Sequence, residues 1–255
     1  MILSLYRYRW LLYELVLRDL IQRYRGSALG FLWTLLNPVL FMGVYTLVFS
    51  VYLRAGVDHY ALFLVSAMVP WLWFASSIQQ GTNSIIDGRM YVGKAAFAPV
   101  VLIFVPVLSN LVNFLLTLPF LFVVVALSHH KVGLPLIVLP LLIAIQFLLT
   151  LAALLFTATF NVFYRDLQQL VPIALLLMFY LIPIFYPLSS VPEAIQPFIL
   201  ANPFASIALA YQHIFYQNAW PDFNLLAYTT LTALVLFAVG VAVFARYEET
   251  FTEYL

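Results

Sequence analysis

Charged residues are so sparse in this chain that long stretches of sequence contain none. Seven uncharged segments follow one another, at 26–53, 59–86, 95–130, 132–164, 167–192, 194–221 and 223–245. A helix needs about 20 residues to cross the ~30 Å hydrocarbon core of a bilayer, and six of these segments supply that many mostly apolar residues. The pattern predicts an all-α integral membrane protein with a single transmembrane domain over 1–255. We expect its six transmembrane helices at 28–53, 60–82, 97–127, 134–163, 169–187 and 223–245.

The overall composition excludes most soluble classes of protein. Hydrophobic residues make up 65% of the 255 residues and charged residues 8%, whereas soluble domains carry about 45–50% and about 25%. So little charge cannot cover the surface of a water-soluble globule. The net charge of +1 comes without a basic block, which argues against nucleic-acid binding. The absence of cysteine excludes disulfides, thiolate zinc sites and iron–sulfur clusters.

Segment 194–221 is more polar than the other six. It carries Gln196, Pro197, Asn202, Pro203, Gln212, His213, Gln217 and Asn218. We therefore interpret it as two short, broken helices within a region at 188–222, on the outer side of the membrane between the fifth and sixth spans. Such irregular backbone is tolerated at membrane depth only where protein or a water-filled cavity covers it.

Positive charges predict the orientation of the chain. If the N-terminus is inside, nine basic residues lie in cytoplasmic segments: Arg7, Arg9, Arg18, Arg23, Arg25, Arg89, Lys94, Arg165 and Arg246. The external loops hold two, Arg54 and Lys131. This bias predicts that both termini are cytoplasmic. A seventh span at 194–221 would move only Arg246 outside, so charge leaves that alternative open, and the polar composition of the segment argues against it.

Residues 8–25 form a separate, amphipathic pattern ahead of the first span. At the helical period of 100° per residue, Glu14, Arg18, Gln22 and Arg25 share one stripe. The opposite arc is apolar or aromatic and holds Trp10, Tyr13, Val16, Leu17, Leu20, Ile21 and Tyr24. The pattern predicts a helix that lies in the cytoplasmic interface. A plain membrane anchor is the alternative.

The loop at 83–95 contains a sequence close to a phosphate-binding loop. Residues 88–95 fit G-x-x-x-x-G-K, but Ala95 stands where Ser or Thr would hold Mg²⁺, and no strand precedes the loop. We therefore exclude nucleotide binding here. The loop is short, is predicted to be cytoplasmic and carries charges of both signs, which suits contact with a soluble partner. Retention of topology by Arg89 and Lys94 alone is the alternative.

A second charged site, Arg165 and Asp166, closes the fourth predicted span as either a helix end-cap or a partner contact. None of the six spans needs an ionisable residue near its midpoint, whereas ion-coupled transporters usually keep one there. The energy for transport must therefore come from outside the chain, or the protein is passive.

No metal site is predicted, because His129 and His130 lack a nearby carboxylate. No Ser/His/Asp grouping that would support a hydrolase can be placed.

Three stretches, taken in order, resemble a known family. The first is 22–33 (QRYRGSALGFLW) with Asn37, Pro38 and 45–49 (YTLVF); the second is 70–74 (PWLWF) with 83–86 (NSII) and Lys94; the third is 161–166 (NVFYRD) with Pro183, Tyr186, Pro187, 191–193 (VPE), Asn202 and Pro203. This order is similar to that of the membrane subunits of polysaccharide ABC exporters, which move O antigens, capsular polymers or teichoic acids. The resemblance covers about residues 10–245. Ala98 departs from the family pattern, in which proline often follows the aromatic residue directly.

The resemblance implies a homodimer of six-span subunits, docked to two cytoplasmic ATPase subunits in the bacterial inner membrane. ATP and Mg would belong to the ATPase partner, while this chain would hold no cofactor and would not be an enzyme. The contacts that couple it to the ATPase would map to Ile86, Asp87, Arg89, Met90, Tyr91, Lys94, Arg165 and Asp166. The aromatic rings that line the channel would be Trp33, Tyr45, Phe49, Tyr180, Tyr186 and Tyr211. Segment 188–222 would form periplasmic gate helices, and Arg18, Arg23 and Arg25 would meet the pyrophosphate of a lipid carrier.

We therefore expect the channel-forming permease subunit of an ATP-driven exporter. It would move a lipid-linked polysaccharide, with O antigen as the first choice, from the cytoplasm to the outer face of the inner membrane. One alternative is an exporter of teichoic acid, another lipid or a drug, and another is an energy-independent lipid-glycan channel or flippase. A membrane glycosyl- or acyltransferase lacks the intramembrane acid–base pair that its chemistry needs.

Overall fold

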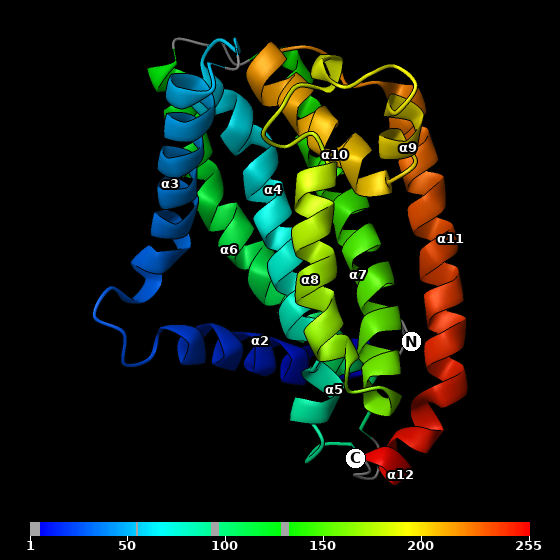
Figure 1. The fold of residues 1–255 in the computed structure, drawn as a ribbon. Coiled ribbons are helices and arrows are strands. Elements are labelled where there is room, and N and C mark those ends of the chain that lie inside the picture. Colours follow the sequence, from blue (N-terminus) through cyan, green and yellow to red (C-terminus); the bar gives the residue numbers. More distant parts are fainter. Residues whose placement is uncertain (1–5, 55, 93–96, 129–132) are drawn as a thin grey trace.

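The computed structural model describes residues 6–54, 56–92, 97–128 and 133–255, and all regular structure within these ranges is helical. Upright helices stand side by side, and α2 lies across the end of the bundle that they form (Figure 1). The upright helices are α3 (Trp33–Thr46), α4 (Tyr60–Gly81), α6 (Val100–Leu127), α7 (Leu139–Phe163), α8 (Leu167–Leu181) and α11 (Phe223–Tyr247). This confirms the all-α prediction. A helix pairs its backbone N–H and C=O groups within itself, as hydrocarbon requires.

Five helical segments within the described residues are long and apolar enough to cross a membrane. They are Gly30–Tyr52, Tyr60–Gly81, Val100–Leu127, Leu134–Phe163 and Phe223–Tyr254. Helix α8 has 15 residues, fewer than the roughly 20 that a full crossing needs. It ends where it does because Ile182 precedes Pro183 and takes an extended conformation, with φ −88° and ψ 143°. The helix at the fifth predicted span is therefore short, and a sixth crossing stays a prediction.

Short turns extend two of these spans beyond their α-helices. The 3₁₀ turn η1 (Gly30–Leu32) precedes α3, and the π-helix η2 (Leu47–Tyr52) follows it. The 3₁₀ turn η3 (Leu134–Val138) leads into α7. Each turn adds backbone hydrogen bonds within the span beyond the end of its α-helix.

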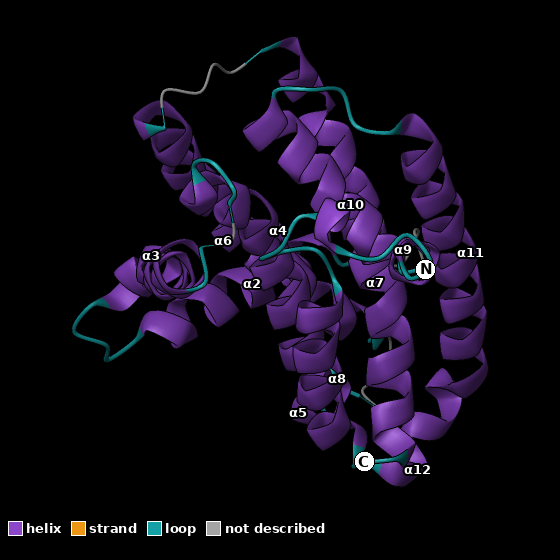
Figure 2. Cartoon of the chain, turned by 45° about the horizontal axis from the view of Figure 1, so that its top comes forward, coloured by secondary structure: helices purple, strands orange, loops and turns teal. Residues whose placement is uncertain are grey.

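Helix α4 forms the centre of the bundle, with α3, α6, α7, α8 and α10 (Pro203–Gln212) packed around it. In its most apolar 18-residue stretch 78% of the residues are buried, against 6% for the first span. Helix α11 packs mainly on α7, and α3 stands on the opposite side of the molecule from α11 (Figure 2). The first span therefore leaves most of its apolar surface uncovered by its own chain.

Helix α2 (Arg9–Tyr24) packs against α6 at the end of the bundle that also carries α5 (Ser84–Asp87) and α12 (Phe251–Tyr254) (Figure 1). We call this the α2 end. The exposed apolar side chains of helix α2 include Trp10, Tyr13, Leu17 and Ile21. Gly26 (φ 78°) and Gly30 (φ 47°) adopt left-handed backbone, which turns the chain from α2 into the first span. A helix that lies across the spans and keeps exposed apolar residues is consistent with the predicted interfacial helix.

The polar region after α8 folds partly into the bundle rather than over it. Its elements are η4 (Leu188–Ser190), α9 (Gln196–Leu200), α10 and the π-helix η5 (His213–Gln217). Asn202 caps α10 by accepting from the N–H of Phe204 at 2.9 Å, and Pro203 occupies the first turn. Eight of the ten residues of α10 are buried. Protein thus covers this short helix, the condition under which irregular backbone is tolerated at membrane depth.

Gly240 allows α11 to approach α7 closely, and this contact predicts a stability effect. A Cβ atom at this position would lie 3.1 Å from Cβ of Leu155. Because that Cβ is fixed to the α7 backbone, side-chain rotation cannot relieve the overlap. Gly240→Leu should therefore destabilise the detergent-solubilised protein by about 2 kcal/mol, seen as a lower midpoint of thermal unfolding. Ala242→Leu, at an exposed position of the same helix, should leave that midpoint unchanged, and an equal loss in both variants would contradict the close packing.

Candidate functional site

The two charged segments that were predicted to contact an ATPase both lie at the α2 end (Figure 1). Their exposed members are Asp87, Arg89, Met90, Arg165 and Asp166. Ile86 and Tyr91 are half-buried, and the prediction for Lys94 falls outside the described residues. Charged groups of both signs are thus accessible on one end of the molecule.

The described part of the first segment, residues 83–92, folds into hydrogen-bonded turns and is not an extended loop. We call it the projection. In α5 the N–H of Asp87 donates to the carbonyl of Asn83 at 2.9 Å, and the N–H of Gly88 donates to that of Ser84 at 3.0 Å. A Cβ atom on Gly88 would lie 2.5 Å from Cδ1 of Leu102, so a larger residue here would force the Leu102 side chain of α6 to shift. A contact made by this projection would therefore push on α6 directly.

Helix α2 is attached to the same projection by a hydrogen bond and by aromatic contacts. Nη1 of Arg18 donates to the hydroxyl of Tyr91 at 3.2 Å. The ring of Tyr91 packs on Phe97 with centroids 5.6 Å apart, and Phe97 in turn contacts Tyr8 at 6.3 Å. Movement of the projection would therefore be transmitted to α2 as well as to α6.

The carboxyl group of Asp87 is partly desolvated. Burial raises the pKa of Asp87 above its ordinary value, because neighbouring atoms exclude some of the water that would solvate the charged form. A basic group of a docking partner would stabilise the carboxylate and lower that pKa again. Elsewhere in the described residues, no group of three or more His, Asp or Glu side chains is arranged to hold a metal ion.

Asn161 joins the two charged segments, a role that the sequence analysis did not assign to it. Its Nδ2 donates to the carbonyl of Thr82 at 3.1 Å and to Oδ1 of Asn83 at 2.8 Å. Its own Oδ1 accepts from the N–H of Gln168 at 3.1 Å. The side chain is fully buried. One amide therefore ties the end of α4 to the junction of α7 and α8, on which Arg165 lies.

The three arginines of α2 and its C-terminus have different surroundings. Arg18 bonds to the projection, as described above. Arg23 forms a salt bridge with Asp19 at 2.5 Å and donates to Oδ1 of Asn110 at 2.8 Å. Arg25 is exposed, and its guanidinium has no partner among the described residues. The charge of Arg23 is thus already compensated, whereas those of Arg18 and Arg25 are accessible.

Four of the predicted channel aromatics meet in one cluster. Tyr45 and Phe49 stack with ring centroids 6.1 Å apart on the first span, and Phe185 packs on Phe49 at 5.0 Å. Tyr180 and Tyr186 contact Phe185 edge-on, at 5.5 and 5.0 Å. We call these five residues the aromatic cluster. It joins the first span to α8 and to the segment that follows α8.

Trp33 and Tyr211 lie apart from the aromatic cluster. Trp33 starts α3 near the α2 end and is 41% exposed. Tyr211 is fully buried in α10, with its ring 6.2 Å from Phe114 and 6.5 Å from Phe215. The ring of Tyr211 therefore faces the interior of the subunit, unlike the surface position that a channel lining implies.

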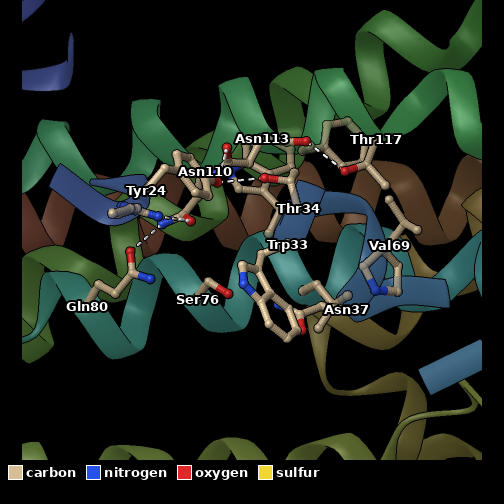
Figure 3. Close-up of a pocket in the computed structure, with 15 residues that line it drawn as sticks. Tyr24, Trp33, Thr34, Asn37, Val69, Ser76, Gln80, Asn110, Asn113 and Thr117 are labelled. Carbon is tan, nitrogen blue, oxygen red and sulfur yellow. Dashed lines mark hydrogen bonds between the residues drawn. The ribbon is translucent and has the colours of Figure 1, made fainter. Parts of the chain in front are cut away.

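A polar pocket that was not predicted lies between α2, α3, α4 and α6 (Figure 3). It has a volume of about 230 Å³ and is lined by Arg23, Tyr24, Trp33, Thr34, Asn37, Pro38, Val69, Leu72, Trp73, Ser76, Gln80, Asn110, Asn113, Phe114 and Thr117. We call it the amide pocket. The signal in the sequence was helical spacing. Asn110, Asn113 and Thr117 share one face of α6, and Ser76 and Gln80 share one face of α4.

The role of Asn161 predicts that its replacement destabilises the α2 end. Asn161→Leu removes three hydrogen bonds and leaves the carbonyl of Thr82 buried without this donor. A loss of about 2 kcal/mol in unfolding free energy is expected, with faster proteolysis of the segment around Arg165. Gln168→Leu is the matched control, because Gln168 contributes only its backbone N–H. Unchanged unfolding and proteolysis in Asn161→Leu would contradict the assignment.

Comparison with known proteins identifies the family of the chain. The ABC-2 type transporter family matches residues 11–216. The O-antigen export system permease protein RfbA of Myxococcus xanthus is 38% identical over 252 residues, which cover 98% of this chain and 97% of that protein. Two proteins of the same name from Klebsiella pneumoniae are 32% and 31% identical, each over 93% of this chain and 92% of the relative. From the family match and these full-length relatives, the chain belongs to the ABC-2 type transporter family.

Proposed function

We propose that this chain is the permease subunit of an ATP-driven exporter that moves lipid-linked O antigen across the bacterial inner membrane. The observation that carries the proposal is the 38% identity to an O-antigen export permease over 98% of the chain. The transported molecule named for that relative and for the two from Klebsiella pneumoniae is the same. The proposal places the α2 end in the cytoplasm, as the excess of basic residues predicts.

The energy for export would come from two ATPase subunits that bind ATP and Mg. The spans need no ionisable residue near the middle of the membrane, so ion coupling has no support in this chain. The α2 end offers instead the exposed side chains of Asp87, Arg89, Met90, Arg165 and Asp166. Closure of the ATPase pair would push on α5, and the packing of Gly88 on Leu102 would pass the displacement to α6.

The export path would form between two copies of the chain. The first span exposes most of its apolar stretch, and a second copy would cover it. The aromatic cluster lies on this span and on α8, with Tyr180 50% exposed. Flat rings offer weak, poorly directional contacts to the apolar faces of sugars, so successive units of a polymer would slide past without being held too tightly.

The lipid carrier would reach the exporter beside α2. An interfacial helix lies at the depth of lipid headgroups, and Arg18 and Arg25 present accessible guanidinium groups there. Arginine binds phosphate oxygens through paired N–H donors. Arg23, which is bonded to Asp19 and Asn110, would hold α2 against α6 at the same place.

Export of O antigen to the cell surface tests the proposal directly. The double variant Asp87→Ala and Arg89→Ala should reduce surface O antigen at least tenfold, because docking of the ATPase would bury these charges in pairs, and truncating one partner of a buried, hydrogen-bonded charge pair costs about 2–5 kcal/mol. Immunoblots of membranes should show normal insertion. Glu193→Ala, an exposed carboxylate in the segment between α8 and α9, should export normally. Full export by the double variant would contradict coupling through α5 and favour an energy-independent channel or flippase.

A further inference from the structure

The amide pocket lies among three helical segments that are long and apolar enough to cross a membrane, the first span, α4 and α6. It extends along α4 from Gln80 to Val69, which corresponds to about 16 Å at 1.5 Å per residue. That length is roughly half of the ~30 Å hydrocarbon core. Polar side chains at such depth are costly, and they usually mark a functional site.

One side of the amide pocket is formed by a hydrogen-bonded chain with no net charge. Arg23 pairs with Asp19 and donates to Oδ1 of Asn110, as described above. Nδ2 of Asn110 in turn donates to Oε1 of Gln80 at 2.9 Å. Arg23 is the one charged residue among those that line the pocket. The described pocket therefore has no uncompensated cation that would select a phosphate or a carboxylate.

The amide pocket also presents neutral hydrogen-bonding groups from α3, α4 and α6. Those without a partner in the described structure are the amide of Asn37, the hydroxyl of Ser76, the indole N–H of Trp33, Nδ2 of Asn113 and Nε2 of Gln80. Figure 3 shows Ser76 and Gln80 on α4 opposite Asn110 and Asn113 on α6. Donors and acceptors from three helices thus converge on one small space.

We propose that the amide pocket binds the sugar ring nearest to the lipid carrier while the carrier lies in the cytoplasmic leaflet. A sugar ring is uncharged and carries several hydroxyl groups, each of which both donates and accepts. Its apolar faces match the rings of Trp33 and Phe114, which line the same pocket. The inference rests on the proposed function and adds to it a site that recognises the first sugar.

Other occupants fit the pocket less well. A bare pyrophosphate would lack a free cation to balance its charge, because Arg23 is already paired. A hydrocarbon tail would make no hydrogen bonds with the amides and the hydroxyl, so the polar groups that line the pocket would not contribute to its binding. The pocket also lies within reach of the headgroup region, because α2 forms one of its walls.

The test measures binding to the exporter, purified with its partner subunits and reconstituted in lipid nanodiscs. Three probes are compared: a short-chain prenyl pyrophosphate bearing one N-acetylhexosamine, the same compound bearing one hexose, and the same compound without sugar. The sugar-free compound distinguishes recognition of the sugar from recognition of the lipid. Free N-acetylglucosamine serves as a competitor, which shows whether the ring is recognised alone or only when attached to lipid. The variant is Asn37→Leu with Ser76→Ala, and the matched control is Gln79→Leu, an exposed amide next to Gln80 that does not line the pocket.

The proposal predicts that at least one sugar-bearing probe binds wild-type protein about tenfold more tightly than the sugar-free probe. Free N-acetylglucosamine should reduce that difference if the ring alone is recognised, and leave it if the ring must be attached to lipid; either result supports a sugar site. The double variant should lose the difference and keep the affinity for the sugar-free probe. Its melting temperature should match that of Gln79→Leu, because neither replaced side chain has a partner in the described protein.

The proposal is overturned if the sugar adds no affinity in wild-type protein, or if the double variant weakens all three probes equally. Neither result depends on ATP-driven transport. If wild-type protein showed no sugar preference while surface export still required Asp87 and Arg89, the proposed function would stand and the sugar site would fail. If a sugar preference were lost in the double variant while export proved independent of the ATPase, the sugar site would stand and the driven exporter would fail.

Discussion

The rest of this structure depends on the pairing of every backbone N–H and C=O group within hydrocarbon. The requirement explains why all regular structure in the described residues is helical. It also explains the short helix α10, which begins at Pro203 after the Asn202 cap and is stable because other helices bury it. Side chains extend the same principle. The buried amide of Asn161 satisfies three groups at two places in the chain, where α4 ends and where α7 gives way to α8.

These pairings make the α2 end a connected unit. Asn161 holds the two charged segments together, Arg18 links α2 to Tyr91, and Gly88 lets α5 lie directly on α6. Force applied at the exposed charges would reach α2, α4, α6 and α8 through direct contacts between described residues. A second set of contacts on α2, α6 and α4, from Arg23 through Asn110 to Gln80, forms one wall of the amide pocket. In the proposed exporter, the same helices would therefore take part in recognising the cargo and in docking the ATPase.

The sequence predicted the fold because its few charged residues mark the ends of long uncharged segments. The contacts of individual side chains were harder to predict. The uncharged segments predicted five helices that the structure shows. A residue before proline prefers extended backbone, and this preference, applied to Ile182 and Pro183, would have shortened the fifth predicted span. The burial of Tyr211 was not predictable, since an aromatic residue suits both a channel lining and a core. Asn161 lies in the stretch 161–166 that resembles the family, but no role was predicted for it, because its partners Thr82 and Asn83 are about 80 positions away in the sequence. The amide pocket needs three helices to meet, although the spacing of Asn110, Asn113 and Thr117 hinted at a polar face.

The central claim is that this permease works as half of an ATP-driven exporter. The most direct test is the composition of the complex extracted from native membranes with a mild detergent, determined by native mass spectrometry. The account predicts two copies of this chain with two copies of an ATPase subunit. A stable dimer of this chain without any ATPase, under conditions that preserve lipid and nucleotide, would contradict it, because the chain would then have no source of energy for export.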